Sequence, residues 1–368
     1  MRSRLGTRWP LAAAVVVALA CTPSSPPAKP APVTAAPAAA APATAARSPT
    51  SPPSAAAPTP AAPVTPESLS VALPVLSQAF LPYFIARERG YYAEERIETD
   101  LQAVAPQLGV QGVVAGSYSF TGAVSQAAIA ALTGAPTRVV LNTHSITWWL
   151  VANQASGVRT VADLKGKTLG IEGPGTLSST FTRVLLRKNG LNPDGDVQFA
   201  SLGPVPNWLQ GAIGGAVDAA IAGDVDLLLV AQAQGLTDVA WYGQDVRGSL
   251  IGLGTSESLL RDKPDAVKRF LRASLRGLQS YRTNREDTIA LGARLLDQPA
   301  DFVGRAYDLG TSLLLPEPML DPSVQQEFVD LAKETLNLDR PIPPGEVFDY
   351  NLTRQALAEQ AARPAGAR

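Results

Sequence analysis

Two residue types that often build metal sites and active sites are almost missing from this sequence. Among its 368 residues there is one cysteine, Cys21, and one histidine, His144. A single thiol cannot form a disulfide within the chain, and this pair cannot supply the four ligands of a structural zinc site. No serine stands in a G-x-S-x-G elbow, the usual setting of a hydrolase nucleophile. We therefore expect no metal, no cofactor and no enzymatic activity.

Positive charge and long apolar runs are also scarce. The formal net charge is −1, and lysine and arginine form no stripe or cluster. This pattern excludes nucleic acid as an expected partner. A membrane-spanning helix needs about 20 apolar residues, and no run after residue 21 approaches that length. We expect the folded part of the chain to lie outside the membrane.

The first 21 residues have the pattern of an export signal. Arginines stand at positions 2, 4 and 8, and an apolar run of ten residues follows at 11–20. That run is too short to span a bilayer but fits a cleaved signal. Residues 17–21, Val-Ala-Leu-Ala-Cys, resemble a bacterial lipobox, which implies lipidation of Cys21 and a signal peptide of residues 1–20. The alternative is an ordinary secretory signal with an incidental cysteine.

A segment dominated by proline and alanine follows. Residues 22–66 contain 14 Pro and 16 Ala, no aromatic residue and almost no charge. Such a chain has nothing to bury against its conformational entropy, so it is typical of a disordered, partly polyproline-extended linker. Fully extended, it would reach on the order of 140 Å at about 3.1 Å per residue. We predict a tether of residues 21–67 that holds a folded domain away from the lipid surface.

The remaining sequence alternates between strand and helix patterns twice. Strands expected at 69–75, 97–103, 118–121 and 138–143 alternate with helices at 81–89, 107–115 and 123–132. A second set pairs strands at 168–171, 197–202, 217–221 and 238–242 with helices at 176–188, 207–214 and 225–234. After residue 263 the pattern is helical, at 263–282, 285–296, 299–309 and 324–336. This order predicts two α/β units with mainly parallel sheets, followed by helices.

Several short segments, taken in order, resemble one known family. Ser77-Gln78-Ala79-Phe80 is followed by a helix and by Gly90-Tyr91-Tyr92, a step that leads into an isoleucine-led strand. The segment 160–171 resembles the opening of the family's second lobe, and 215–220, Gly-Ala-Val-Asp-Ala-Ala, resembles its "G-x-V-D-A" step. The family comprises periplasmic substrate-binding proteins of ABC importers for nitrate, aliphatic sulfonates, taurine and the thiamine pyrimidine. The resemblance covers residues 69–340.

The resemblance implies a fold, a set of partners and a location. The fold is the two-lobed α/β periplasmic-binding-protein fold of type II, with a hinge of two crossover segments and C-terminal helices on lobe one. We expect lobe one at 68–152 and 248–357, lobe two at 153–247, and a flexible tail at 358–368. The implied partners are a small-molecule ligand and an ABC permease with its ATPase. We expect a monomer, held on the extracytoplasmic side of a bacterial membrane by the lipid at Cys21.

The ligand site is predicted from sheet geometry, because open α/β sheets bind ligands beyond the carboxyl ends of their strands. That rule selects the loops 77–80, 119–122 and 143–145 in lobe one, and 173–178, 203–206 and 223–224 in lobe two. The residues that we predict to contact the ligand are Ser77, Gln78, Phe80, Ser119, Phe120, Thr121, Thr143, Gly175, Thr176, Leu177, Ser178 and Asp224.

The loop 173–180 is the strongest candidate among these. Its glycines keep the backbone open, and its hydroxyl-rich helix start presents N–H groups to a polar or anionic group. A plain helix cap by Thr176 or Ser178 is the alternative. No lysine or arginine lies in the best candidate loops. A sulfonate, a small carboxylate and a neutral polar heterocycle all stay open as ligands.

Other side chains have weaker signals. A lone histidine such as His144 is more often structural than a ligand contact. Asp218 and Asp224 form a possible carboxylate pair for an amine ligand, although Asp218 is more simply explained as a turn or capping residue. Trp148 and Trp149 precede a crossover, where packing at the hinge is the simpler interpretation.

Two other functions compete with solute capture for an importer. One is an enzyme on the same fold, similar to thiamine-pyrimidine synthases or menaquinone-pathway enzymes. This chain lacks the cysteine-rich iron motif of the synthases. The other is a lipoprotein that senses a ligand and signals to a partner. The sequence does not separate sensing from transport.

Overall fold

The computed structural model describes residues 66–362, except for the side chain of Pro206. The predicted signal peptide, the lipidation site Cys21 and nearly all of the predicted linker lie outside these residues, so they stay predictions. Within the described residues, no helix combines the length and the apolar character needed to cross a membrane.

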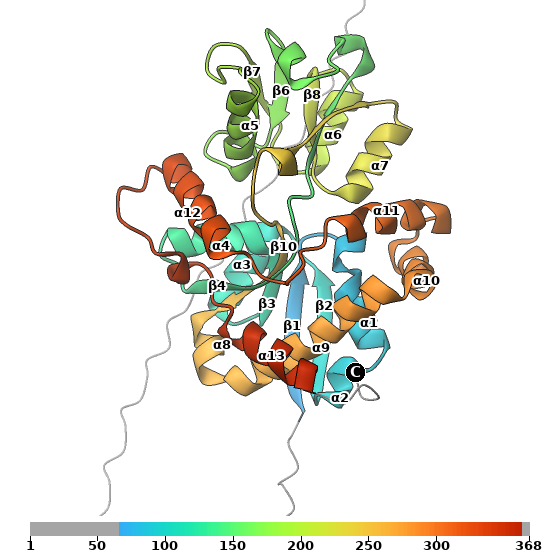
Figure 1. The fold of residues 1–368 in the computed structure, drawn as a ribbon, viewed down its shortest axis with the longest axis vertical. Coiled ribbons are helices and arrows are strands. Elements are labelled where there is room, and N and C mark those ends of the chain that lie inside the picture. The colour runs from blue at the N-terminus through green and yellow to red at the C-terminus, as the bar shows by residue number, and fades with distance from the viewer. Residues whose placement is uncertain (1–65, 363–368) are drawn as a thin grey trace, which may run out of the picture. The chain divides into compact units, whose positions relative to one another are not determined.

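The chain builds two five-stranded sheets of identical topology (Figure 1). The first has the order β2-β1-β3-β10-β4, and the second has the order β7-β6-β8-β5-β9. In each sheet one strand runs antiparallel to its neighbours: β10 in the first and β5 in the second. We call the elements around the first sheet lobe one and those around the second lobe two. The strands are β1 Glu67–Leu73, β2 Ile97–Ala103, β3 Phe120–Ala123, β4 Thr137–His144, β5 Trp149–Ala152, β6 Thr168–Ile171, β7 Gln198–Ser201, β8 Ala219–Ala222, β9 Thr237–Trp241 and β10 Ile251–Ser256.

The antiparallel strands explain how the lobes are joined. Strand β5 is the first element of lobe two after the chain leaves β4, and β10 is the first element of lobe one after the chain returns. The crossings are therefore residues 145–148 and 242–250. Tyr242 N–H donates to Trp148 O at 3.0 Å, so the two crossings contact each other. The Trp148 ring lies 5.7 Å from Phe181 and Trp208, which confirms the packing interpretation at the hinge.

Helices cover both sheets. They are α1 Leu81–Glu88, α2 Tyr91–Glu94, α3 Pro106–Ala115, α4 Val124–Leu132, α5 Leu177–Lys188, α6 Pro206–Ile213, α7 Val225–Ala233, α8 Glu257–Asp262, α9 Pro264–Thr283, α10 Arg285–Leu296, α11 Ala300–Ser312, α12 Pro322–Leu336 and α13 Asn351–Ala362. A 3-10 turn, η1 (Gln78–Phe80), leads directly into α1.

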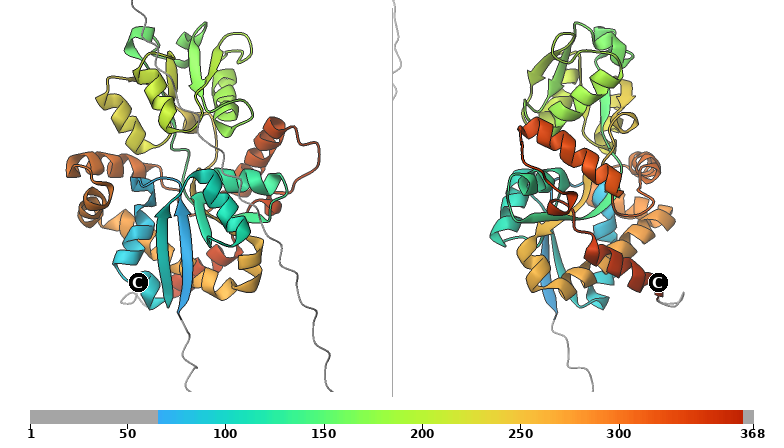
Figure 2. Two further views of the ribbon diagram at one scale, coloured as in Figure 1. Left: turned by 180° about the vertical axis from the view of Figure 1, so that it is seen from behind. Right: turned by 60° about the vertical axis from the view of Figure 1, so that its left-hand side comes forward.

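The C-terminal helices pack on lobe one, and two of them also contact lobe two. Helix α12 packs on α4 of lobe one and on α5 of lobe two, and Figure 2 shows it passing across both. Helix α11 contacts α7, where Arg305 donates to Gln232 at 3.3 Å. The lobes are therefore linked by the crossings and by these two helices.

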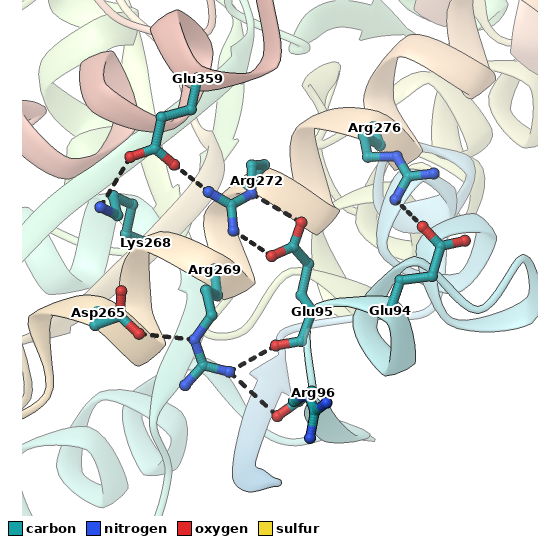
Figure 3. A network of polar contacts seen from close by, with 9 residues as sticks. All are labelled: Glu94, Glu95, Arg96, Asp265, Lys268, Arg269, Arg272, Arg276 and Glu359. Carbon is teal, nitrogen blue, oxygen red and sulfur yellow. Dashed lines mark hydrogen bonds and ion pairs between the residues drawn. The ribbon is translucent and has the colours of Figure 1, made fainter. Parts of the chain in front are cut away.

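Helix α9 packs against α1, the helix that follows directly after the turn η1. A side chain at Gly277 would place its Cβ 2.8 Å from the Cβ of Ala86, so glycine lets α9 pack directly on α1. On its other side α9 carries an ion-pair network with α2 and α13, drawn in Figure 3. Arg272 donates to both oxygens of Glu95 and pairs with Glu359.

The predicted elements are largely present, with three differences. Strand β3 begins at Phe120, two residues later than expected, and β5 was taken only as part of a crossover. Helices α2, α8 and α13 and strand β10 were not among the predicted elements. Because α13 continues to Ala362, residues 358–362 are helical rather than part of a flexible tail. The exact limits of the two lobes stay predictions.

Candidate functional site

A hydrogen bond joins the lobes at the carboxyl ends of the parallel strands of both sheets. Gln78, in η1 after β1, donates its backbone N–H to Asp226 Oδ2 at 2.9 Å. Asp226 lies in the first turn of α7, just after β8. The rule of strand ends therefore selected Gln78 and the loop 223–224 that leads into α7, but not Asp226 itself.

Gln78 is held rigidly on the lobe-one side. Its side chain is 1% exposed, and its Oε1 accepts the hydroxyl proton of Tyr281 from α9. Gly310 of α11 allows this packing, because a Cβ there would lie 2.5 Å from the Gln78 amide. Three segments of lobe one thus set the direction of the Gln78 N–H.

Two carboxylates meet this turn from lobe two. Asp224 caps α7, and its Oδ1 accepts from Leu227 N–H at 2.9 Å. Asp226 Oδ1 is buried and has no hydrogen-bond partner in the described part of the chain. The Ser77 hydroxyl lies beside Asp224 and lowers the pKa of that carboxyl, although no atom meets it in hydrogen-bond geometry. Ser77 is 4% exposed.

Burial dominates the electrostatics of this pair. Burial, and after it the neighbouring Asp224, raise the pKa of Asp226 to about 7, against the opposing effect of the Gln78 N–H. Burial also raises the pKa of Asp224, against hydrogen bonds from Leu227 and Ser77. No cation is among the groups that set either pKa, so the two acids are compensated only by dipoles.

The loop between β6 and α5 uses its hydroxyls internally. Thr176 caps α5 through Ser179 N–H and donates to Gly173 O at 2.7 Å. Ser178 is fully buried and accepts from Glu172 N–H at 3.0 Å. Gly175 has φ +72°, which an L residue adopts only with strain. The cap interpretation accounts for Thr176 and Ser178; Leu177 is buried beside them, and Gly175 is exposed at the tip.

Three predicted residues of lobe one, Phe80, Phe120 and Thr121, lie inside the lobe, and a fourth, Ser119, is half-buried. Phe120 stacks on Phe270 with a centroid distance of 4.3 Å, and Phe80 is 1% exposed in the same apolar core. Thr121 is fully buried and accepts from Ala123 N–H. Ser119 lies just before β3, and its backbone N–H donates to Ser70 O of β1. It was predicted at the carboxyl end of this strand because the strand was expected two residues too early. Packing explains these four without a ligand.

Thr143 and His144 end β4 beside this region. Thr143 Oγ1 lies 2.9 Å from His144 Nδ1, and both side chains are buried. Burial and the nearby Arg282 lower the pKa of His144 to about 3. A buried neutral imidazole of this kind fits the structural interpretation of the lone histidine.

Asp218 has the turn or capping role that was the simpler explanation, rather than a pairing with Asp224. Asp218 stands before β8, at its amino end, and its Oδ2 accepts from Thr168 N–H at 2.8 Å. The partner of Asp224 is Asp226, which the sequence analysis missed. The sequence could have indicated Asp226, because acids at alternate positions of a helix start lie beside the free N–H groups of the first turn.

The strand-end loops carry acids but no bases, although Arg282 of α9 lies near His144 at the end of β4. The loops after β1, β4, β6, β7 and β8 contain no lysine or arginine. The acids at these ends are Asp224, Asp226 and Glu172, a half-buried residue that follows β6 and whose pKa is raised by burial. Within the described residues no group of three His, Cys, Asp or Glu is arranged to hold a metal ion.

A separate cavity of about 640 Å³ lies at the hinge. It is lined by the second crossing, by the segment before α12 and by the start of α13, including Arg247, Met319, Tyr350 and Arg354. Ser145 is the residue that it shares with the predicted loops.

We expect Gly310→Ala to disturb the site more than the fold. The new Cβ would overlap the Gln78 amide, so Gln78 must shift, and the contact between Gln78 and Asp226 weakens. Overpacking of this kind costs about 1–3 kcal/mol, to be measured by urea unfolding. Gly304→Ala in the same helix is the matched control, because its Cβ would meet no atom closer than 3.5 Å. Equal stability of the two variants would contradict this account.

The duplicated sheet, the two crossings and the facing strand ends define a class: proteins with the two-lobed periplasmic-binding-protein fold. Solved structures agree. The alkanesulfonate-binding protein SsuA from Xanthomonas axonopodis pv. citri, bound to MOPS, has a TM-score of 0.62 at 19% identity, covering 77% of this chain and 99% of that one. The desulfurization enzyme DszB has a TM-score of 0.58 at 17% identity, covering 80% and 99%.

The family follows from the sequence. A family model described as "NMT1/THI5 like" matches residues 77–288, and the chain belongs to that family. The predicted resemblance is thereby confirmed. The riboflavin-binding protein RibY of Chloroflexus aurantiacus is 28% identical over 235 residues. That match covers 60% of this chain and 63% of RibY, so slightly less than two thirds of the relative is represented.

Proposed function

We propose that this protein is an extracytoplasmic solute-binding protein, which captures a small organic molecule between its lobes and delivers it to an ABC importer. The observation that carries the proposal is the meeting of strand-end loops from two like sheets that are joined by two crossings. Ligand sites in open α/β sheets lie at such ends. A two-lobed protein of this design releases its ligand when the lobes separate.

The lipid anchor and the transporter are part of the same proposal. An export signal that ends in Cys21 and a proline-rich tether would hold the lobes near a membrane, within reach of a permease and its ATPase. Monomeric action follows from the same arrangement, since one chain supplies both walls of the site.

Two ligand classes have support from relatives. SsuA is an alkanesulfonate-binding protein and RibY is a riboflavin-binding protein. RibY shares more sequence with this chain, so a heterocycle such as riboflavin is our first candidate, ahead of a sulfonate, taurine, nitrate or a pyrimidine. The enzyme DszB shows that the fold also supports catalysis. The site described above offers acids without a histidine or cysteine nucleophile beside them, which favours binding over turnover.

The proposal is tested with full-length protein that is unfolded, washed free of bound molecules and refolded. We expect one of riboflavin, a thiamine-type pyrimidine, an alkanesulfonate, taurine or nitrate to raise the Tm in a saturable way. A ligand at 100 times its Kd stabilises by about 2.7 kcal/mol, which is readily measured. Mass spectrometry of molecules that co-purify with the native protein extends the search beyond this panel.

The opposite result has a clear form. Stripped protein that shows no shift with any of these compounds, together with no co-purified small molecule, would count against solute capture. Detectable chemical conversion of a compound by the purified protein would favour the enzyme.

A further inference from the structure

The lobe contact also indicates what kind of solute the site accepts. The backbone N–H of Gln78 is the cleft-facing donor of lobe one, and a carboxylate of the protein itself occupies it at 2.9 Å. A bound sulfonate or nitrate would need a donor of this kind and would have to compete with Asp226 for it.

Two buried groups at the same place lack partners. Ser77 is 4% exposed. Its hydroxyl lies beside Asp224 but makes no hydrogen bond within the described residues. Asp226 Oδ1 is buried and is likewise unpaired among the described residues. Buried polar atoms are rarely left unsatisfied, because each costs about as much as a lost hydrogen bond. Asp226 Oδ1 therefore presents an acceptor that lacks a donor, and the Ser77 hydroxyl presents a group that can donate or accept.

An anion at this position would meet two acids and no cation from the strand-end loops, while Arg282 of α9 lies near His144. The loops after β1, β4, β6, β7 and β8 contain no lysine or arginine, and Asp224, Asp226 and Glu172 lie at these strand ends. Placing like charges side by side in a desolvated interface costs several kcal/mol. An N–H, an O–H or an ammonium group would instead donate a charge-assisted hydrogen bond to the pair.

We propose that Asp224 and Asp226 form the specificity element of the site: they select solutes that present hydrogen-bond donors or positive charge, and they reject free sulfonates and nitrate. This inference rests on the proposed function of solute capture, and it narrows the ligand class within it. When a solute enters, its donor group takes the place of the Gln78 N–H on Asp226 and also reaches Ser77 and Asp224.

The first arm of the test uses riboflavin and riboflavin 5′-phosphate, which share one ring and differ by a phosphate. Wild-type protein is expected to bind riboflavin more tightly than its phosphate in calorimetry. Asp226→Asn should weaken riboflavin binding by about 10- to 100-fold, the value of a hydrogen bond to a charged group. Asp339→Asn, a change at an exposed acid far from the site in sequence, is the control and should leave the affinity unchanged.

The second arm does not depend on riboflavin being the natural solute. In Asp224→Asn/Asp226→Ala, asparagine keeps the cap of α7 while alanine frees the Gln78 N–H. We expect 1-butanesulfonate to bind this variant at least about tenfold more tightly than wild type, because the like charges are gone. Circular dichroism and Tm confirm that the variant is folded; should it fail to fold, Asp226→Asn with the same sulfonate replaces it.

The outcomes separate the inference from the function beneath it. Tight sulfonate binding by wild type, with no gain in the acid-free variant, would overturn the inference and leave solute capture intact. A gain of sulfonate binding in the variant supports the inference even where riboflavin fails. Unchanged riboflavin affinity in Asp226→Asn, in protein that binds riboflavin, would also overturn it.

Discussion

Replacing Arg272 with methionine is expected to lower the free energy of unfolding by about 3–5 kcal/mol. Arg272 donates to both carboxylate oxygens of Glu95, and the side chains are 12% and 5% exposed (Figure 3). Methionine keeps the length and the apolar stem of arginine but removes the charge. Glu95 then stays ionised in a buried place without its main cation, or takes up a proton.

The size of this loss depends on burial, which a matched pair tests. Arg285 also makes a two-pronged contact, with both oxygens of Asp308 at 2.8 Å, but these side chains are 46% and 58% exposed. Exposed pairs contribute less than about 1 kcal/mol, so Arg285→Met should change little. Urea unfolding of both variants measures the difference. Similar losses for the two arginines would show that burial is not the cause.

A double variant then assigns the loss to the unpaired acid. Adding Glu95→Gln to Arg272→Met removes the charge that has lost its partner, so we expect part of the stability to return. A loss of stability in α9 is also expected to affect the candidate site. Besides Arg272, this helix carries the contact with α1 and Tyr281, whose hydroxyl donates to Gln78. No recovery in the double variant would mean that lost packing, and not the buried charge, dominates.

The periodic parts of the fold could be predicted from sequence, and the non-local parts could not. Alternating strands and helices were clear because each element buries one face, as Val71 and Leu73 of β1 and Leu185 and Leu186 of α5 do. Strand β5 was harder to recognise: its four residues are all buried, so they show no alternation that separates a strand from a connection. Strand β10, whose six residues are likewise all buried, was not among the predicted strands.

The site was predicted at the level of loops rather than side chains. The strand-end rule selected Gln78, Ser77 and Asp224, which lie at the contact between the lobes. It also selected Ser119 and Phe120, because the predicted strand lay two residues too early. Residues at the start of the observed strand were therefore expected at its carboxyl end. Asp226 was missed since its partner Gln78 is 148 positions away, and no local pattern encodes that contact.

The closure of the lobes is expected to depend on pH through Asp226. In the closed arrangement burial and Asp224 raise the pKa of Asp226 to about 7 from its ordinary 3.8. When the lobes separate, the carboxyl is solvated and returns toward its ordinary pKa. Closure of the unliganded protein therefore takes up a proton, so it is favoured at low pH and is weakened as the pH rises through 7. Between pH 8 and pH 5 the change is about 2–3 kcal/mol in favour of closure.

The measurement follows the distance between the lobes rather than global unfolding. Fluorescent labels on Glu98→Cys and Gln234→Cys, both exposed, in a chain with Cys21→Ser report closure by energy transfer. A distance is needed because His144 acts on unfolding with the opposite sign: its pKa is lowered to about 3, so its contribution to stability is lost as the pH falls below its ordinary 6.5. Asp339→Asn serves as the control for a change of net charge.

Asp226→Asn should remove most of this pH dependence. The asparagine oxygen can still accept from the Gln78 N–H, but it takes up no proton and carries no charge to bury. Closure of the variant at pH 8 should then match closure of the wild type at pH 5. Two other titratable groups face this carboxyl. Burial raises the pKa of Asp224, and burial together with Asp226 raises the pKa of Tyr281. Of the two, only Asp224 adds a small residual pH dependence of the same sign. A wild-type distance that is equal at pH 5 and pH 8, or a variant with the full slope, would show that this carboxylate does not control closure.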